Sequence, residues 1–205
     1  MTRILLVRHG QSTWNADGRW QGRADPPLSD LGRRQAEVAG DTLAELGIAR
    51  VVASPLVRAH ETATIIGAAL GLPVEPDARL QERDAGEWTG KTRDEIEAGW
   101  PGFLAGGERP AGFETDDVLH GRALAAIGDV AARAEEPVVV ISHGGLIRVV
   151  ERALGSEPHS VPNLGGLDIH RLDDTGGARD ARLALAGRLV LIDAAAVTVT
   201  APPEV

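Results

Sequence analysis

Short apolar runs that end in polar residues alternate with longer amphipathic stretches along most of this chain. Short, wholly apolar runs stand at residues 4–7, 51–53 and 138–141. Continuous apolar runs of this length predict strands that are buried on both faces, as in a parallel sheet. Longer stretches repeat their apolar residues at helical spacing and predict helices over 29–46, 56–70, 115–134 and 144–154. This alternation predicts an α/β domain with a largely parallel sheet.

Capping residues indicate where two of the helices begin. Ser54 precedes the stretch over 56–70 and is expected to cap that helix. Thr92 and Glu95 have the spacing of a capping box, which predicts a further short helix over 92–98.

The remaining stretches give weaker patterns. Residues 100–112 are rich in glycine and proline and predict a loop. The buried side of the helix over 115–134 is expected to hold Val118, Leu119, Leu124, Ile127, Val130 and Ala131. Three further strands are predicted over 72–75, 166–172 and 183–192, the last two antiparallel because their connection is short. The tail from residue 194 is expected to be frayed.

Composition narrows the class of protein. A length of 205 residues fits one domain over 1–205, and 43% apolar with 25% charged residues is ordinary for a soluble globular chain. The net charge of −9, without blocks of like charge, argues against a nucleic-acid partner. The absence of cysteine excludes disulfides, thiolate zinc sites and a cysteine nucleophile. No apolar run approaches the roughly 20 residues of a membrane span and no signal peptide is evident, so we expect a cytoplasmic protein without a membrane partner. Whether it forms a homodimer stays open.

Three of the predicted strands are followed by residues that carry chemistry. In chain order these are Arg8, His9 and Gly10, then Ser54, Pro55 and Arg58, and then His143, Gly144 and Gly145. The carboxyl ends of parallel strands meet at one edge of a sheet, where ligands bind, so two arginines and two histidines should converge. Buried groups of like sign need a partner of opposite charge, and the planar guanidinium suits phosphate oxygens. The sequence therefore predicts a phosphate site at this edge.

Such a site could transfer a phosphoryl group. A neutral imidazole can attack phosphorus and form a phosphohistidine, while the arginines and the second histidine neutralise the charge on the equatorial oxygens. The leaving alcohol also needs a proton donor, for which the residues themselves leave open Glu82, Asp84 and Glu87. No carboxylate or cysteine stands at ligand spacing to His9 or His143, so we expect no metal site.

The order and spacing of these motifs resemble one family. The matching residues form five groups: Leu6 to Ser12 with Asn15; Gln21, Gly22, Asp25, Pro27, Leu28, Gly32, Gln35 and Ala36; Ser54 to Leu56 with Arg58, Ala59, Thr62 and Ala63; Leu80, Glu82, Gly86, Trp88 and Gly90; and Ser142 to Gly145. In these residues the chain resembles the histidine phosphatase superfamily, in the branch that is similar to cofactor-dependent phosphoglycerate mutase. The resemblance runs in order from the first strand to about residue 154.

The resemblance implies a role for each candidate site residue. His9 would accept the phosphoryl group, and Glu82 would act as general acid and then as the base that activates water. The phosphate pocket would be completed by Arg8, Arg58 and His143. Positions that contact phosphate or substrate in the family match Asn15, Gln21, Gly22 and Gly144. The family fold would be a three-layer sandwich with a mostly parallel mixed sheet and a small helical and loop cover, and it would need no metal or other cofactor.

Several reactions are compatible with this core. The stretch between Glu82 and residue 138 is compact, and residues 112–115 fall where phosphatase-like members often carry Gly-Gly-Glu-Ser. A phosphatase of a small phosphorylated metabolite, such as a sugar phosphate or phosphoglycerate, is therefore favoured. The alternative is a phosphotransferase of the phosphoglycerate mutase type. A non-catalytic phospholigand-binding protein ranks third, because it predicts loss of His9 or Glu82. The substrate would be decided by pocket walls expected over 100–113 and 158–167.

Overall fold

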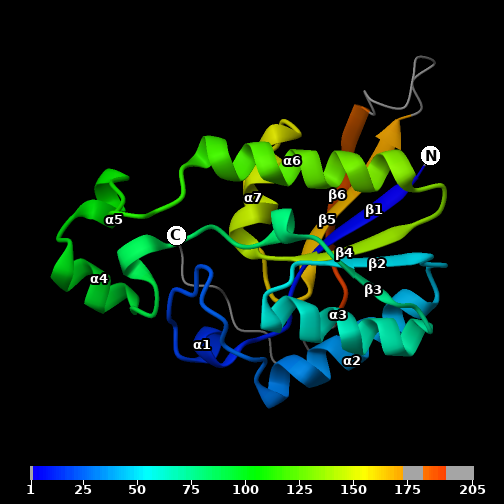
Figure 1. The fold of residues 1–205 in the computed structure, drawn as a ribbon, viewed down its shortest axis with the longest axis horizontal. Coiled ribbons are helices and arrows are strands. Elements are labelled where there is room, and N and C mark those ends of the chain that lie inside the picture. Colours follow the sequence, from blue (N-terminus) through cyan, green and yellow to red (C-terminus); the bar gives the residue numbers. More distant parts are fainter. Residues whose placement is uncertain (1, 173–181, 193–205) are drawn as a thin grey trace.

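A six-stranded sheet forms the centre of the computed structural model, which describes residues 2–172 and 182–192 (Figure 1). Its strands are β1 (Arg3–Arg8), β2 (Arg50–Ala53), β3 (Val74–Pro76), β4 (Val138–Ser142), β5 (Gly165–Leu172) and β6 (Arg182–Val190). They lie in the order β3-β2-β4-β1-β5-β6. The first four in this order run parallel to one another, whereas β5 and β6 are antiparallel to their neighbours. The largely parallel mixed sheet is therefore confirmed.

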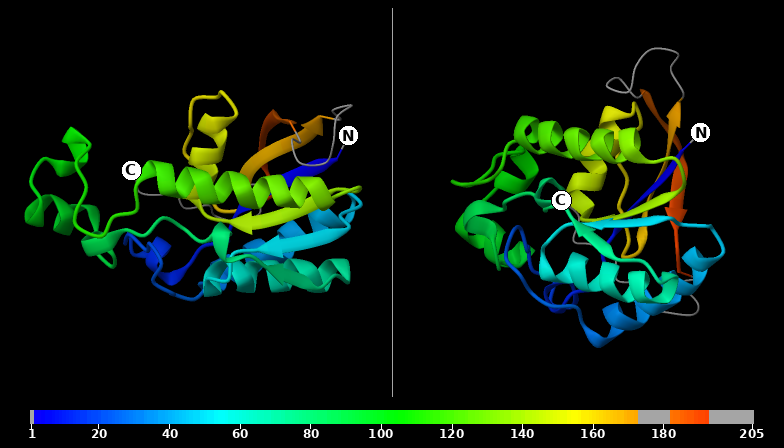
Figure 2. Two further views of the ribbon diagram at one scale, coloured as in Figure 1. Left: turned by 45° about the horizontal axis from the view of Figure 1, so that its top comes forward. Right: turned by 45° about the vertical axis from the view of Figure 1, so that its right-hand side comes forward.

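Helices cover both faces of this sheet and complete the expected three-layer sandwich (Figures 1 and 2). One face carries α2 (Asp30–Ala44) and α3 (Val57–Leu70), and the other carries α6 (Asp116–Arg133) and α7 (Gly144–Ala153). Side chains alternate along β1, so Ile4 and Leu6 pack in the α6 and α7 layer while Leu5 and Val7 pack in the α2 and α3 layer. Because β1 is apolar on both faces, it belongs in the interior of the sheet. Within the described residues, none of the helices combines the length and the apolarity needed to cross a membrane.

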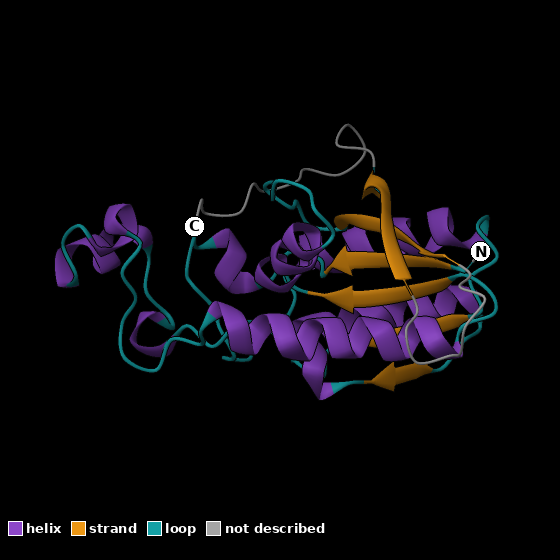
Figure 3. Ribbon diagram, turned by 90° about the horizontal axis from the view of Figure 1, so that it is seen from above, coloured by secondary structure: helices purple, strands orange, loops and turns teal. Residues whose placement is uncertain are grey.

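Between β3 and α6 the chain leaves the sheet and builds the cover that the family resemblance implies. Figure 3 shows its helices standing away from the sheet at the left. Its elements are the 3-10 turns η1 (Ala78–Leu80) and η2 (Gly86–Trp88) and the helices α4 (Arg93–Gly99) and α5 (Phe103–Gly106), and the short helix α1 (Thr13–Ala16) follows β1. A separate small core of Ala85, Trp88 and Ile96 stabilises the cover. The predicted capping box is confirmed, since the Glu95 amide donates to Thr92 Oγ1 at 3.3 Å and the Thr92 amide donates to Glu95 at 2.8 Å.

Three local predictions were wrong, and one lies outside the described residues. Helix α5 occupies part of the predicted loop over 100–112. Val118 is 58% exposed, because the buried face of α6 runs through Leu119 and Val118 lies about 100° away from it around the helix. Ser54 does not cap α3, because the N-cap residue is Leu56 and the Ser54 hydroxyl accepts from the amide of Leu56 itself while it also faces a histidine. The tail from residue 194 is not among the described residues.

The chain that leaves β1 crosses the first turn of α2 with backbone against backbone. A Cβ atom on Gly10 would lie 2.6 Å from the carbonyl oxygen of Gly32. A Cβ atom on Gly32 would overlap the carbonyl oxygen of Gln11. Glycine at both positions therefore allows α2 to hold the segment that follows β1.

We predict that Gly32→Ala lowers the free energy of unfolding by roughly 1–3 kcal/mol, because an added methyl group forces apart a closed contact. Urea denaturation measures this change. Gly128→Ala in α6 is the matched control, since its Cβ would meet no atom within 4 Å. The control should stabilise the protein by up to about 1 kcal/mol, because alanine is the better helix former. A wild-type midpoint for Gly32→Ala would contradict the close crossing.

Candidate active site

The carboxyl ends of β1 and β4 bring two histidines together. Arg8 and Ser142 are paired in register at the strand ends, so the residues that follow them, His9 and His143, leave the sheet side by side. The centroids of the two imidazole rings lie 5.2 Å apart, and both side chains are buried. Arg58, in the first turn of α3, donates from Nε to Nε2 of His9 at 3.3 Å. The predicted convergence of two arginines and two histidines is confirmed.

Hydrogen bonds assign the ring proton of His9 to Nδ1. This atom lies 2.6 Å from the carbonyl oxygen of Gly10, which can only accept. Nε2 accepts from Arg58 and therefore carries a lone pair. Burial lowers the pKa of His9 well below its ordinary value, and the charges of Arg58 and Arg8 lower it further. The ring is thus neutral, which is the form in which an imidazole can act as a nucleophile.

Backbone carbonyls hold the two buried arginines of the site. Arg8 Nη1 donates to the carbonyl oxygen of Val161 at 2.8 Å. Arg58 donates from Nη1 to the carbonyl oxygen of Ala24 at 2.7 Å and from Nη2 to that of Gly22 at 2.9 Å. Neither guanidinium forms an ion pair with a carboxylate in the described part of the chain. Burial lowers the pKa of each to about 10, so both are protonated at neutral pH and attract an anion.

His143 presents a buried donor beside these charges. The Leu56 amide donates to Ser54 Oγ at 3.3 Å, so the hydroxyl proton of Ser54 is available for Nε2 of His143, 2.8 Å away. With Ser54 as the donor in this bond, the ring proton of His143 lies on Nδ1, which is buried and has no hydrogen-bond partner in residues 2–172 or 182–192. Burial, followed by the charges of Arg58 and His9, lowers the pKa of His143 well below its ordinary value. A buried N–H without a protein partner suits a phosphoryl oxygen.

Of the three candidate proton donors, Glu82 alone lines the pocket. Its Oε2 atom accepts from the Gly145 amide at 2.9 Å, and its Oε1 atom accepts from the Arg83 amide at 2.7 Å. Asp84 instead closes a backbone turn, and Glu87 is exposed. The sequence alone left three carboxylates open as proton donors, and the geometry favours Glu82 because only its side chain lines the pocket.

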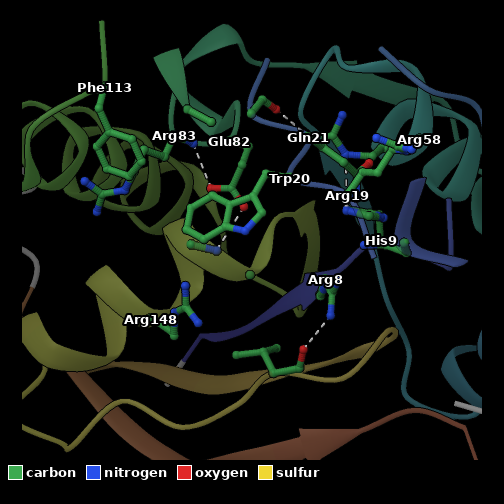
Figure 4. Close-up of a pocket in the computed structure, with 16 residues that line it drawn as sticks. Arg8, His9, Arg19, Trp20, Gln21, Arg58, Glu82, Arg83, Phe113 and Arg148 are labelled. Carbon is green, nitrogen blue, oxygen red and sulfur yellow. Dashed lines mark hydrogen bonds between the residues drawn. The ribbon is translucent and has the colours of Figure 1, made fainter. Parts of the chain in front are cut away.

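Figure 4 shows the pocket that these groups surround. The candidate residues that line it are Arg8, His9, Asn15, Gln21, Gly22, Arg58, Glu82 and Gly144. His143 packs against the ring of His9. The walls expected over 100–113 and 158–167 contribute Phe113 and Val161. Three further arginines line the pocket and were not among the predicted site residues: Arg19, Arg83 and Arg148. Across the described ranges, no group of three or more histidine and carboxylate side chains is arranged to hold a metal ion.

Arg148 differs from the other two arginines that were missed. Arg19 pairs with a glutamate at 3.1 Å, and Arg83 pairs with an aspartate at 2.6 Å. Arg148 is half-buried and forms no hydrogen bond or ion pair with any described residue, and burial lowers its pKa. Its position could have been recognised from spacing, because Arg148 follows Gly144 by four residues and so lies on the same face of α7.

The two buried histidines should make the fold less stable in acid. An unfolded chain protonates histidine near pH 6.5, whereas the lowered pKa values of His9 and His143 keep both neutral in the fold. The contribution of the two histidines to the free energy of unfolding is fully present above about pH 6.5. It is lost as the pH falls below about 6.5, at up to about 1.4 kcal/mol per pH unit for each ring. We predict that the free energy of unfolding of His143→Asn falls less steeply between roughly pH 6.5 and 5.5 than that of the wild type, by about the contribution of one histidine ring. Urea denaturation at several pH values measures this difference. His120→Asn, at an exposed histidine, should keep the wild-type dependence; the same dependence in His143→Asn would refute the prediction.

Comparisons with known protein sequences agree with this geometry. The family model of the histidine phosphatase superfamily, branch 1, matches residues 4–177. A glucosyl-3-phosphoglycerate phosphatase of Mycolicibacterium vanbaalenii is 38% identical over 179 residues, which cover 80% of this chain and 80% of that protein. The phosphoglycerate mutase-like protein 4 of Arabidopsis thaliana is 38% identical over 161 residues, which cover 73% of this chain and 70% of that protein.

Comparison with solved structures gives the same family. A mycobacterial glucosyl-3-phosphoglycerate phosphatase in complex with VO3 has a TM-score of 0.80 and 30% sequence identity, covering 90% of this chain and 97% of that chain. A phosphoglycerate mutase from Bacillus anthracis shares the fold, with a TM-score of 0.73. The resemblance stated from the sequence is confirmed: the chain belongs to branch 1 of the histidine phosphatase superfamily and is a phosphatase of that family.

Proposed function

We propose that this enzyme transfers the phosphoryl group of a small phosphomonoester to Nε2 of His9 and then to water. The neutral ring, with its proton on Nδ1, is the observation that carries the proposal. Nε2 attacks phosphorus, the bond between phosphorus and the ester oxygen breaks, and Glu82 in its protonated form gives a proton to the leaving alkoxide. In the second step Glu82 takes a proton from water, the new oxygen–phosphorus bond replaces the nitrogen–phosphorus bond, and inorganic phosphate leaves.

The other candidate residues would bind the group in transfer. Arg8 and Arg58 supply two positive charges, and Nδ1 of His143 supplies a further donor. Donors fixed in this way stabilise the charge on the equatorial oxygens without having to reorganise. Contacts to phosphate and to the rest of the substrate are assigned to Asn15, Gln21, Gly22 and Gly144, all of which line the pocket.

We propose further that the substrate is a phosphorylated acid that carries a sugar ring, of the glucosyl-3-phosphoglycerate type. The relative that is 38% identical bears this name. In this chain Arg148 offers an unpaired cation at the pocket wall, which suits the carboxylate of a glycerate. Trp20 lines the same pocket, and its buried Nε1 has no hydrogen-bond partner in the described ranges, so this N–H is available to a sugar hydroxyl.

The first test is release of nitrophenol from p-nitrophenyl phosphate with a metal chelator present. We expect the wild type to turn over under these conditions and His9→Ala to lose roughly a thousandfold or more in kcat. The control His120→Ala should be unaffected, since that residue is exposed and outside the pocket. An active His9→Ala variant would refute the phosphohistidine.

The same preparation separates the other two functions. A phosphoglycerate mutase would exchange the position of the phosphoryl group, with a bisphosphoglycerate primer, faster than it releases inorganic phosphate. A non-catalytic binding protein would bind phosphoesters and release phosphate from none of them. Either result would replace the phosphatase as the function of this site.

Arg148→Gln tests the substrate class. We expect kcat/KM for glucosyl-3-phosphoglycerate to fall about 10- to 100-fold, because a charged hydrogen bond to the carboxylate is lost, while p-nitrophenyl phosphate is affected less than about twofold. Arg152→Gln is the matched control one turn further along α7, where the side chain is 61% exposed and lies 3.7 Å from Asp116. Equal losses on both substrates in Arg148→Gln would rule out a carboxylate site at this arginine.

A further inference from the structure

Arg122 of α6 lies beside the segment that carries Glu82 and does not line the pocket. Its Nε and Nη2 atoms donate to the two carboxylate oxygens of Glu114, each at 2.8 Å. Nη1 donates to the carbonyl oxygen of Arg79 at 2.8 Å and also to that of Gln81. Nη2 donates to the carbonyl oxygen of Glu82 itself at 2.9 Å. One guanidinium therefore joins a carboxylate to three main-chain carbonyls around the candidate proton donor.

Glu114 holds the same segment at its other end. The Asp84 amide donates to Glu114 Oε2 at 3.2 Å, and the Glu114 amide donates to the carbonyl oxygen of Asp84 at 2.9 Å. Arg83 Nη1 donates to the carbonyl oxygen of Glu114 at 2.7 Å. The Glu114 side chain is only 5% exposed. Burial acts to raise the pKa of Glu114. The hydrogen bonds and charge of Arg122, with smaller contributions from the Asp84 amide and the charge of Arg23, outweigh burial and lower the pKa, so Glu114 is ionised at neutral pH.

Arg122 and Glu114 provide the main-chain hydrogen bonds that a helix or strand would otherwise provide. Residues 81–85 lie between η1 and η2 and belong to no helix or strand. Their main-chain groups need hydrogen-bond partners, and Arg122 and Glu114 supply them. A group that transfers a proton must be held to within about 0.5 Å of its working position, which a loop without such support does not achieve.

We propose that Arg122 and Glu114 are positioning residues, which fix the backbone of residues 79–84 so that the Glu82 carboxyl reaches the oxygen of the leaving group. The inference rests on the proposed role of Glu82 as proton donor. It differs from a purely structural role, in which the pair would only tie the cover to α6. The two roles predict different effects of the leaving group.

Proton donation matters for an alkyl phosphate, because an alkoxide is a poor leaving group, but hardly matters for 2,4-dinitrophenyl phosphate, whose phenolate leaves unaided. The value of kcat/KM reports only the steps up to release of the alcohol or phenol, so the later use of Glu82 as a base does not enter the comparison. Glu82→Gln sets the reference for a complete loss of proton donation.

Arg122→Lys is the principal variant. Lysine keeps a positive charge beside Glu114. It lacks the planar guanidinium, however, and so cannot bind the Glu114 carboxylate and the three main-chain carbonyls at the same time. We expect kcat/KM for an alkyl phosphate such as glycerol phosphate to fall about 10- to 100-fold and that for 2,4-dinitrophenyl phosphate to change less than about threefold. Glu114→Gln should show the same asymmetry and serves if Arg122→Lys does not fold. Arg50→Lys is the matched control, because Arg50 makes a comparable two-bond pair with Glu75 far along the sheet, at 2.9 Å and 2.7 Å.

The outcomes separate the inference from the function on which it rests. If Glu82→Gln lowers kcat/KM equally for the alkyl phosphate and for 2,4-dinitrophenyl phosphate, Glu82 is not the proton donor. Glu82→Gln could instead lower kcat/KM more for the alkyl phosphate than for 2,4-dinitrophenyl phosphate. If Arg122→Lys and Glu114→Gln then lower kcat/KM equally for both substrates, or leave both values unchanged, the positioning role is overturned while the proposed function stands. If all three variants lose more kcat/KM for the alkyl phosphate than for 2,4-dinitrophenyl phosphate, and Arg50→Lys is unaffected, both the positioning role and the proposed function are supported.

Discussion

Two buried guanidinium groups beside two buried imidazoles form the constraint on which the rest of this structure depends. Arg8 and Arg58 are charged where burial opposes charge, as their lowered pKa values show. Carbonyl oxygens hold the guanidinium groups in place, and His9 and His143 avoid repelling them by staying neutral. In the proposed function, the phosphate ester supplies the negative charge that balances this arrangement at the sheet edge.

Main-chain contacts from two separate layers position the reacting groups. At the sheet edge, the Leu164 amide donates to the carbonyl oxygen of Arg8 at 3.0 Å, and the Asn163 side chain donates to that of His9 at 2.9 Å. On the opposite side, Arg122 of α6 holds the carbonyls around Glu82. The proposed nucleophile, His9, and the candidate proton donor, Glu82, are therefore held by different elements. Their relative position depends on how α6 packs on the sheet through the shared apolar core.

The strand ends could be predicted from the sequence because an apolar run and the break after it are local signals, which placed His9 and His143 at one edge. Glu82 required the family resemblance, since the irregular segment around it has no periodicity. The supporting contacts could not be predicted. Ser54 and His143 are 89 residues apart, and Arg122 is 40 residues from the carbonyl that it holds at Glu82. Such long-range contacts between side chains and backbone leave no pattern of spacing or composition.

The strand order also determines when this site can exist during synthesis. Strand β1 leads into His9, the proposed nucleophile, but its neighbours β4 and β5 begin only at Val138 and Gly165, so both leave the ribosome long after β1. The first pairing available to the emerging chain joins β2 to β3. An apolar strand that waits without neighbours is exposed to pairing with other chains, and such non-local pairing also folds slowly. Residues 3–8 therefore stay without their strand partners until most of the chain has been synthesised.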